Sequence, residues 1–237
     1  MSSIQNPEAI NTFISAFSVV SFGFILYHLV TNNPAFKSRE SVTADNTLHI
    51  IIQRLIGIFL FGFSSLFIIT YYLHLPFILF GTGLPDNSTF IWLLILSVFI
   101  IPMNYYNSGN PGNLSQYPQI RNHEWSFSLL ILSALSWIAY LLAYEFMFRG
   151  FFLFSSVPVL GVWPAIILNT AVYSLVHIPK GTKETLGSIP LGIILSYLAV
   201  KTGSFWIAFF THVILAISNE WFSLAAHPEM HFKKALL

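Results

Sequence analysis

Long apolar runs separated by short polar stretches make up most of this chain. A helix needs about 20 apolar residues to cross a bilayer, because each residue adds about 1.5 Å along its axis. Seven stretches have this apolar character, the third being short: 10–30, 50–75, 90–103, 126–155, 162–178, 185–200 and 204–226. The pattern predicts an all-α polytopic transmembrane helical bundle of about seven spans.

Polar stretches between the runs carry residues that end helices and turn the chain. The stretch 107–113 reads NSGNPGN, a composition typical of turns. The expected loops are 31–47, 81–88 and 104–125. No internal repeat is visible, and we expect three parts: N-terminal spans and loops (1–125), a core (126–226) and a cytoplasmic tail (227–237).

Composition agrees with a membrane protein and excludes several kinds of site. The chain is 55% hydrophobic and 8% charged, against about 25% charged residues in soluble domains. A net charge of +1 gives no argument for a nucleic-acid partner. With no cysteine in the sequence, disulfides, thiolate metal sites and a cysteine nucleophile are excluded. The N-terminal apolar run lacks a basic flank and a cleavage site, so we expect it to remain as a span.

The distribution of lysine and arginine predicts the orientation. With seven spans, eight of these residues gather at one face: Lys37, Arg39, Arg54, Arg121, Lys180, Lys183, Lys233 and Lys234. Such a basic face is normally cytoplasmic, which places the C-terminus inside and the N-terminus outside. We expect an integral protein of the plasma membrane. The assignment depends on the short third span, because omitting it would reverse the N-terminal half.

One charged pair lies within an apolar run. Glu145 and Arg149 are four residues apart, so a helix places them on one face within reach of each other. Ionised groups at membrane depth are expensive, and those that occur usually pair and mark a functional site. The alternative is a structural ion pair that holds two helices together.

Three further polar residues lie at similar depths. Measured from the non-cytoplasmic face at about 1.5 Å per residue, Glu145 lies roughly 15 Å deep and His177 roughly 21 Å. His212 and Asn219 lie roughly 12 Å and 22 Å deep on the same basis. Three helices can therefore present a carboxylate, two imidazoles and an amide at one level.

A buried glutamate beside imidazoles suits hydrolysis. The glutamate is a candidate general base that activates water, and an imidazole can donate a hydrogen bond to a developing oxyanion. Zinc bound by Glu145, His177 and His212 is an alternative, but the His-Glu-x-x-His signature is absent. Arg149 would also repel a divalent cation, so we expect no cofactor. A proton-coupled transporter is a less favoured alternative, because it predicts inverted repeats.

These motifs resemble a known family. Residues 144–150 read YEFMFRG, 173–177 read YSLVH, 187–192 read GSIPLG, and 202–206 read TGSFW ahead of Thr211 and His212. In this order they resemble the CPBP family (CAAX protease and bacteriocin-processing, or Abi) of intramembrane peptidases, which includes the type II CAAX prenyl endopeptidases. The resemblance covers about residues 120–226.

The resemblance implies an intramembrane-site endopeptidase that acts on peptides or proteins presented at the lipid bilayer. It assigns the acid–base centre to Glu145 with Arg149, a share in water activation to His177, and oxyanion stabilisation to His212 with Asn219. The family pattern has two adjacent glutamates and a polar residue four positions after the last histidine. In this chain, Tyr144 stands at the position of the first glutamate, and Ala216 stands at the position of the polar residue.

Both departures keep an alternative open. A phenol is a poor base at neutral pH, so Glu145 rather than Tyr144 is expected to activate water, and the Tyr144 hydroxyl is expected to matter far less. Asn219 lies on the same helix face as His212 and is a candidate replacement for the missing amide. The alternative is a catalytically silent member that acts as a membrane scaffold or a bacteriocin-immunity protein.

Overall fold

The computed structural model describes residues 6–33, 36 and 46–233. Its α-helices are α1 (Pro7–Thr31), α3 (Thr47–Gly57), α4 (Ser64–Phe67), α5 (Asn87–Asn107), α6 (Pro111–Leu114), α7 (Phe127–Glu145), α8 (Leu153–Leu160), α9 (Val162–Leu175), α10 (Thr182–Thr202) and α11 (Trp206–Ala226). The π-helical segments are η1 (Ile58–Phe63), η2 (Ile68–Leu73) and η4 (Phe146–Phe152), and the 3-10 segments are η3 (Phe77–Phe80) and η5 (Ile178–Lys180). Two short strands, β1 (Glu124–Trp125) and β2 (His231–Phe232), pair in parallel. The prediction of an all-α polytopic bundle is confirmed.

Six helical stretches of the described part are long and apolar enough to cross a membrane. They are Pro7–Thr31, Thr47–Leu73, Asn87–Asn107, Phe127–Leu160, Thr182–Thr202 and Trp206–Ala226. Most of the predicted loop 31–47 lies outside the described residues. The remaining predicted span, 162–178, is a shorter apolar helix, Val162–Leu175. Residues 6–33, 36 and 46–233 thus contain six candidates of full length, and this seventh apolar helix is short.

Two predicted boundaries need correction. The third apolar run is not short, because Asp86 caps α5 by accepting a hydrogen bond from Thr89 N at 2.8 Å, and the helix has 21 residues. The prediction therefore begins the loop 104–125 four residues too early, because residues 104–107 still belong to α5. In contrast, α9 has only 14 residues and ends at Leu175. Pro179 cannot continue a helix, because it lacks the backbone N–H.

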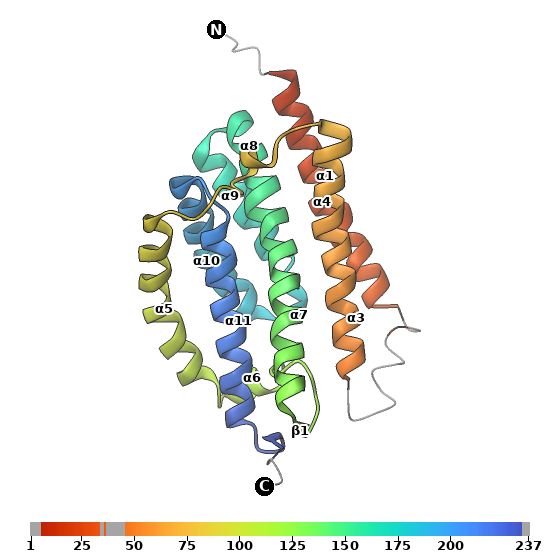
Figure 1. Cartoon of the computed structure of the whole chain (residues 1–237), viewed down its shortest axis with the longest axis vertical. Coiled ribbons are helices and arrows are strands. Elements are labelled where there is room, and N and C mark those ends of the chain that lie inside the picture. The colour runs from red at the N-terminus through yellow and green to blue at the C-terminus, as the bar shows by residue number, and fades with distance from the viewer. Residues whose placement is uncertain (1–5, 34–35, 37–45, 234–237) are drawn as a thin grey trace.

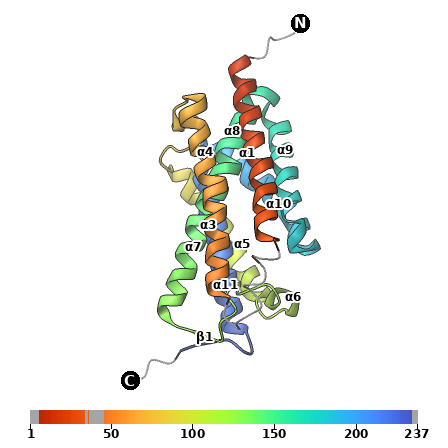
Figure 2. The same ribbon diagram turned by 90° about the vertical axis from the view of Figure 1, so that its right-hand side faces the viewer.

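The helices form a bundle with α7 and α11 at its centre (Figures 1 and 2). α5 and α7 pack against α11, α3 packs against α7, and α9 packs against α10. The start of α1 and the end of α11 lie at opposite ends of the bundle. The pair β1–β2 lies at the end where α11 finishes.

Close contact between α3 and α7 depends on a residue without a side chain. A Cβ atom at Gly57 would lie 2.3 Å from Tyr140 Cε2, closer than atoms of two residues can pack. The Tyr140 ring therefore lies directly over the backbone at Gly57. This contact fixes the height of α3 along α7.

The π-helical segment η4 is joined to α9 and α10 by buried hydrogen bonds. A π-turn breaks the regular α-helical hydrogen-bond ladder, and the carbonyl of Phe148 in η4 accepts a hydrogen bond from Asn169 Nδ2 at 2.8 Å. Asn169 Oδ1 in turn accepts a hydrogen bond from Ser196 Oγ at 3.1 Å. One buried asparagine thus joins η4, α9 and α10.

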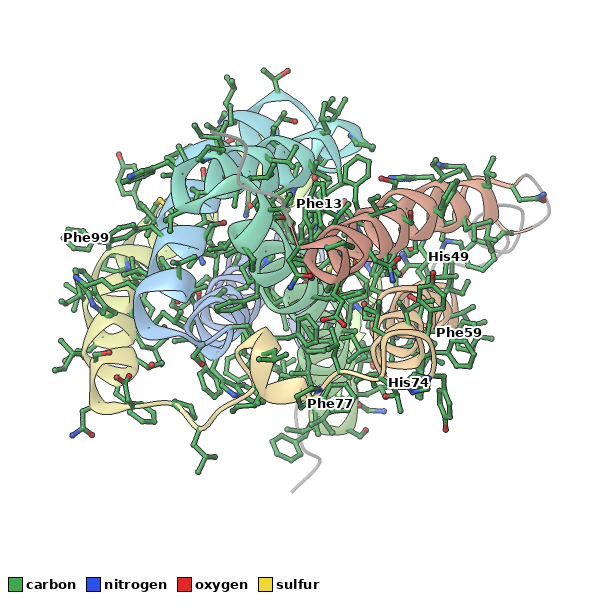
Figure 3. All side chains as sticks on the ribbon, turned by 90° about the horizontal axis from the view of Figure 1, so that it is seen from above. Phe13, His49, Phe59, His74, Phe77 and Phe99 are labelled. Carbon is green, nitrogen blue, oxygen red and sulfur yellow. The ribbon has the colours of Figure 1, made fainter. Side chains whose placement is uncertain are left out.

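Large apolar side chains cover the outside of the bundle. Figure 3 shows Phe59 and Phe99 on its outer sides, where they are 65% and 71% exposed. Such a surface suits a lipid environment. His28, His74 and His123 are partly or fully exposed. His49, in contrast, is only 5% exposed, and it packs against Phe36 at a ring separation of 4.5 Å.

Candidate active site

Glu145 and Arg149 form a buried ion pair where α7 passes into η4. Arg149 Nη1 donates to both carboxylate oxygens of Glu145, at 3.1 Å and 3.0 Å. Neither side chain is exposed. Nη1 makes both contacts, so the other two nitrogens of the guanidinium, Nε and Nη2, do not bind Glu145.

His212 of α11 completes this pair. Its Nδ1 lies 2.6 Å from Glu145 Oε1. Since a carboxylate only accepts hydrogen bonds, the hydrogen-bond pattern assigns the proton to Nδ1. The second ring nitrogen, Nε2, has no hydrogen-bond partner among the described residues. In the neutral ring this nitrogen is an acceptor.

His177 has the same tautomer for a different reason. Its Nδ1 donates to the backbone carbonyl of Tyr173 at 2.8 Å, so Nε2 is again the acceptor in the neutral ring. The side chain is held at the end of α9, where the chain turns into η5. Two imidazoles with fixed orientation therefore expose an unprotonated nitrogen each.

Tyr173 joins the two histidines and Arg149. Its ring centroid lies 4.5 Å from that of His177 and 6.5 Å from that of His212. Arg149 Cζ lies 3.9 Å above the same ring, a cation–π contact. Sequence reasoning treated Tyr173 only as an aromatic motif position. Its spacing of four before His177 was the available signal, because that spacing places both on one helix face.

Glycine at position 150 lets η3 approach the charged pair. A Cβ atom there would lie 2.8 Å from Phe146 Cδ2 and 3.2 Å from the carbonyl oxygen of Phe80. Any side chain would push η3 away from η4. Arg149 Nε and Nη2 remain buried without a hydrogen-bond partner in the described structure. The guanidinium thus has unused donors beside Glu145.

Tyr144 occupies the space next to the histidines. Its ring centroid lies 5.8 Å from that of His212 and 6.1 Å from that of Tyr173, both edge to face. Phe24 and Phe148 pack on its other sides, at 5.9 Å and 4.9 Å. The Tyr144 ring therefore packs against the imidazole of His212 and the ring of Tyr173.

The structure does not connect Asn219 to these groups. No hydrogen bond joins it to another described residue, and its Oδ1 is buried without a partner. Ala216, one turn after His212, is part of the apolar core. Glu145, Arg149, His177 and His212 are thus brought together directly or through Tyr173. Within the described structure, no contact joins Asn219 to any of them.

Glu220 belongs to a second buried cluster. Its Oε1 accepts a hydrogen bond from Ser133 Oγ at 3.0 Å and lies 3.9 Å from Arg54 Nη2. Arg54 Nη1 donates to the carbonyl of Ser133 at 3.0 Å, and its guanidinium lies 4.3 Å from the Trp137 ring centroid. Glu220 is therefore a link between α3, α7 and α11.

The residues at the site do not fit a zinc centre. Within the described residues, no three His, Cys, Asp or Glu side chains are arranged to hold a metal ion. Arg149 also contacts both oxygens of the Glu145 carboxylate. A cation at this carboxylate would have to displace or face the guanidinium charge.

Comparison with known families supports the resemblance seen in the motifs. Residues 124–218 match the family model described as type II CAAX prenyl endopeptidase Rce1-like. The resemblance to the CPBP peptidases is confirmed over this segment, which contains Glu145, Arg149, His177 and His212 and ends before Asn219. The chain matches no curated protein and no solved structure. Together with the apolar helices, the family match marks an integral membrane protein.

Proposed function

We propose that this protein is an intramembrane endopeptidase that hydrolyses peptide bonds of substrates presented at the membrane. The observation that carries the proposal is the 2.6 Å hydrogen bond between His212 Nδ1 and Glu145 Oε1, in a buried site beside Arg149. The family match to CAAX-type peptidases supports the same reaction. No nucleic acid and no cofactor are required.

The geometry favours His212 as the group that takes the proton from water. Glu145 fixes the tautomer in which Nε2 is unprotonated, and its negative charge stabilises the imidazolium that forms. The role of general base, expected for Glu145 from the sequence, therefore moves to His212. Glu145 becomes a positioning residue, and Arg149 holds its carboxylate in place.

The hydrolysis then proceeds in two steps. Water attacks the carbonyl carbon of the peptide bond while one of its protons passes to His212 Nε2. The tetrahedral intermediate collapses with cleavage of the C–N bond, and the proton is delivered to the leaving nitrogen. His177, with its own unprotonated Nε2 beside the same Tyr173 ring, orients the attacking water as an acceptor.

The test compares Glu145→Gln with Glu220→Gln in the purified full chain. Both changes remove one partner of a buried ion pair, at a cost of about 3–5 kcal/mol in stability. Only Glu145→Gln also removes the carboxylate that holds the proton on His212 Nδ1. For this variant we expect about a 10³- to 10⁴-fold loss of kcat. Cleavage of lipid-embedded and prenylated peptides is measured by mass spectrometry.

Two results would contradict the proposal. One is a parent protein that cleaves no member of the peptide and prenylated-peptide panel. The other is a Glu145→Gln variant that, per folded molecule, is as active as Glu220→Gln.

A catalytically silent scaffold or bacteriocin-immunity protein is the second candidate. Two observations favour it. Tyr144 stands at the motif position of a glutamate and packs on Tyr173 and His212. Both oxygens of the Glu145 carboxylate already have hydrogen-bond partners.

The variant Tyr144→Glu distinguishes between the two functions. The unused donors Nε and Nη2 of Arg149 are available to a second carboxylate. An inactive parent that gains peptidase activity as Tyr144→Glu supports the silent function.

A further inference from the structure

Tyr144 lies beside the residue proposed above to take the proton from water. The ring of His212 is 5.8 Å from the Tyr144 ring, centroid to centroid. The two rings stand edge to face, with an interplanar angle of 83°. The phenol ring of α7 and the imidazole of α11 are therefore neighbours.

The hydroxyl of Tyr144 is not used by the fold. It makes no hydrogen bond with any described residue, and it is not one of the fully buried polar atoms that lack a partner. A hydroxyl that the fold leaves without a protein partner is available to a bound molecule or to water.

The other candidate donors are placed differently. Ala216 carries no polar group, and no hydrogen bond or ring contact joins Asn219 to His212 in the described structure. His177 gives its one proton to the Tyr173 carbonyl. Arg149 directs Nη1 to Glu145, and its Cζ lies 3.9 Å from the centroid of the Tyr173 ring. Its Nε and Nη2 have no partner, but no contact in the described structure joins the guanidinium to the His212 ring.

We propose that the Tyr144 hydroxyl is the hydrogen-bond donor that stabilises the oxyanion of the tetrahedral intermediate. The proposal rests on the peptidase function proposed above. The substrate carbonyl oxygen gains negative charge as water adds, and a phenol O–H aimed at this oxygen stabilises it more than it stabilises the ground state. Tyr144 remains protonated throughout and is not the base. This assignment replaces the expectation that its hydroxyl matters little.

The first experiment measures kcat and KM for Tyr144→Phe, with Tyr140→Phe as the matched control. Tyr140 lies one turn earlier on α7, and its ring stacks on that of Tyr144 at 5.9 Å. Both variants lose one hydroxyl and keep the ring. We expect Tyr144→Phe to lower kcat about 100-fold with little change in KM, and Tyr140→Phe to lower it much less. A Tyr144→Phe variant that loses no more kcat than Tyr140→Phe would overturn the proposal.

A second experiment does not depend on turnover. A peptide phosphinate carries the tetrahedral, negatively charged centre of the intermediate, and its binding to the full chain in detergent is followed by calorimetry. We expect affinity to fall by a factor similar to kcat in Tyr144→Phe, and to be retained in Tyr140→Phe. Equal affinities of parent and Tyr144→Phe overturn the assignment. An inactive parent whose phosphinate affinity still falls in Tyr144→Phe refutes the peptidase function while the donor assignment stands.

Discussion

Two buried glutamate–arginine pairs lie in this bundle, and their surroundings give them different properties. Glu220 accepts hydrogen bonds from Ser133, from the Trp137 indole at 3.4 Å and from a backbone N–H, so its contacts all stabilise packing. Glu145 instead holds an imidazole whose second nitrogen has no partner in the described structure. A held imidazole with a free nitrogen can exchange protons, and the cluster at Glu220 offers no such group.

At the residue scale, Asn219→Ala tests whether this amide takes part in the reaction. Its Oδ1 is already buried without a partner, so removing the amide should leave kcat within about threefold and stability within about 1 kcal/mol, the size of a typical single hydrogen bond. His212→Ala, on the same helix, should abolish turnover. Peptide cleavage and thermal unfolding are measured for both variants. A loss of kcat in Asn219→Ala comparable to His212→Ala would place the amide in the active site.

Metal removal tests the chemistry of the same residues. Because Arg149 contacts both oxygens of Glu145, we expect catalysis without a bound metal, and dialysis against EDTA should leave the cleavage rate unchanged. Elemental analysis of the active protein provides the control. About one zinc per chain, lost together with activity in His177→Ala, would refute this prediction.

Residues near one another in sequence were the predictable part of the site. Glu145 and Arg149 lie four apart on one helix, and the depth of His212 followed from helix rise. The role of Tyr173 was not predictable, because it depends on contacts with η4 and α11. The pair Arg54–Glu220 joins residues 166 positions apart, and no local pattern specifies such a contact.

At the scale of elements, the short helix α9 explains how His177 reaches the site. A regular helix through residue 178 would have carried the chain on toward the membrane surface. Instead α9 ends at Leu175, and Pro179 and Gly181, whose φ is 97°, turn the chain back into α10. The apolar run itself could not reveal this early end. Pro179 and Gly181 are present in the sequence, but the span 162–178 was predicted from the length of the apolar run alone.

The tie between η4 and α9 can be tested through Asn169. Asn169→Leu leaves the Phe148 carbonyl and the Ser196 hydroxyl without their partner, which should cost about 1–3 kcal/mol for each buried group left unpaired. Thr170→Val is the matched control, because Thr170 Oγ1 is buried without a partner and its loss should be nearly neutral. Thermal unfolding in detergent measures both. Equal melting temperatures for the two variants would show that this tie adds nothing to stability.

At the scale of the whole molecule, positive charge is concentrated toward one end of the bundle. The Arg121 guanidinium donates to the carbonyl of Leu114, and Gln116 Nε2 donates to the carbonyl of Lys180, so these cations lie near the end where α11 finishes. Lys201 lies apart from them, 5.1 Å from the Trp92 ring centroid near the start of α5. Because basic residues are normally concentrated on the cytoplasmic side, this asymmetry supports the prediction that the C-terminus is cytoplasmic.

Single cysteines can test the orientation, because the chain contains none and background labelling is therefore absent. Leu84 is 94% exposed and lies in the connection between η3 and α5. This connection runs nearer the end of the bundle where α1 starts (Figure 1). Gly109, where an added Cβ meets no atom within 4 Å, follows α5 at the other end. In intact cells, a membrane-impermeant maleimide should label Leu84→Cys, and should label Gly109→Cys only after permeabilisation. The reverse pattern would place the basic end outside and contradict the predicted orientation, while labelling of both in intact cells would contradict the assignment of the third span.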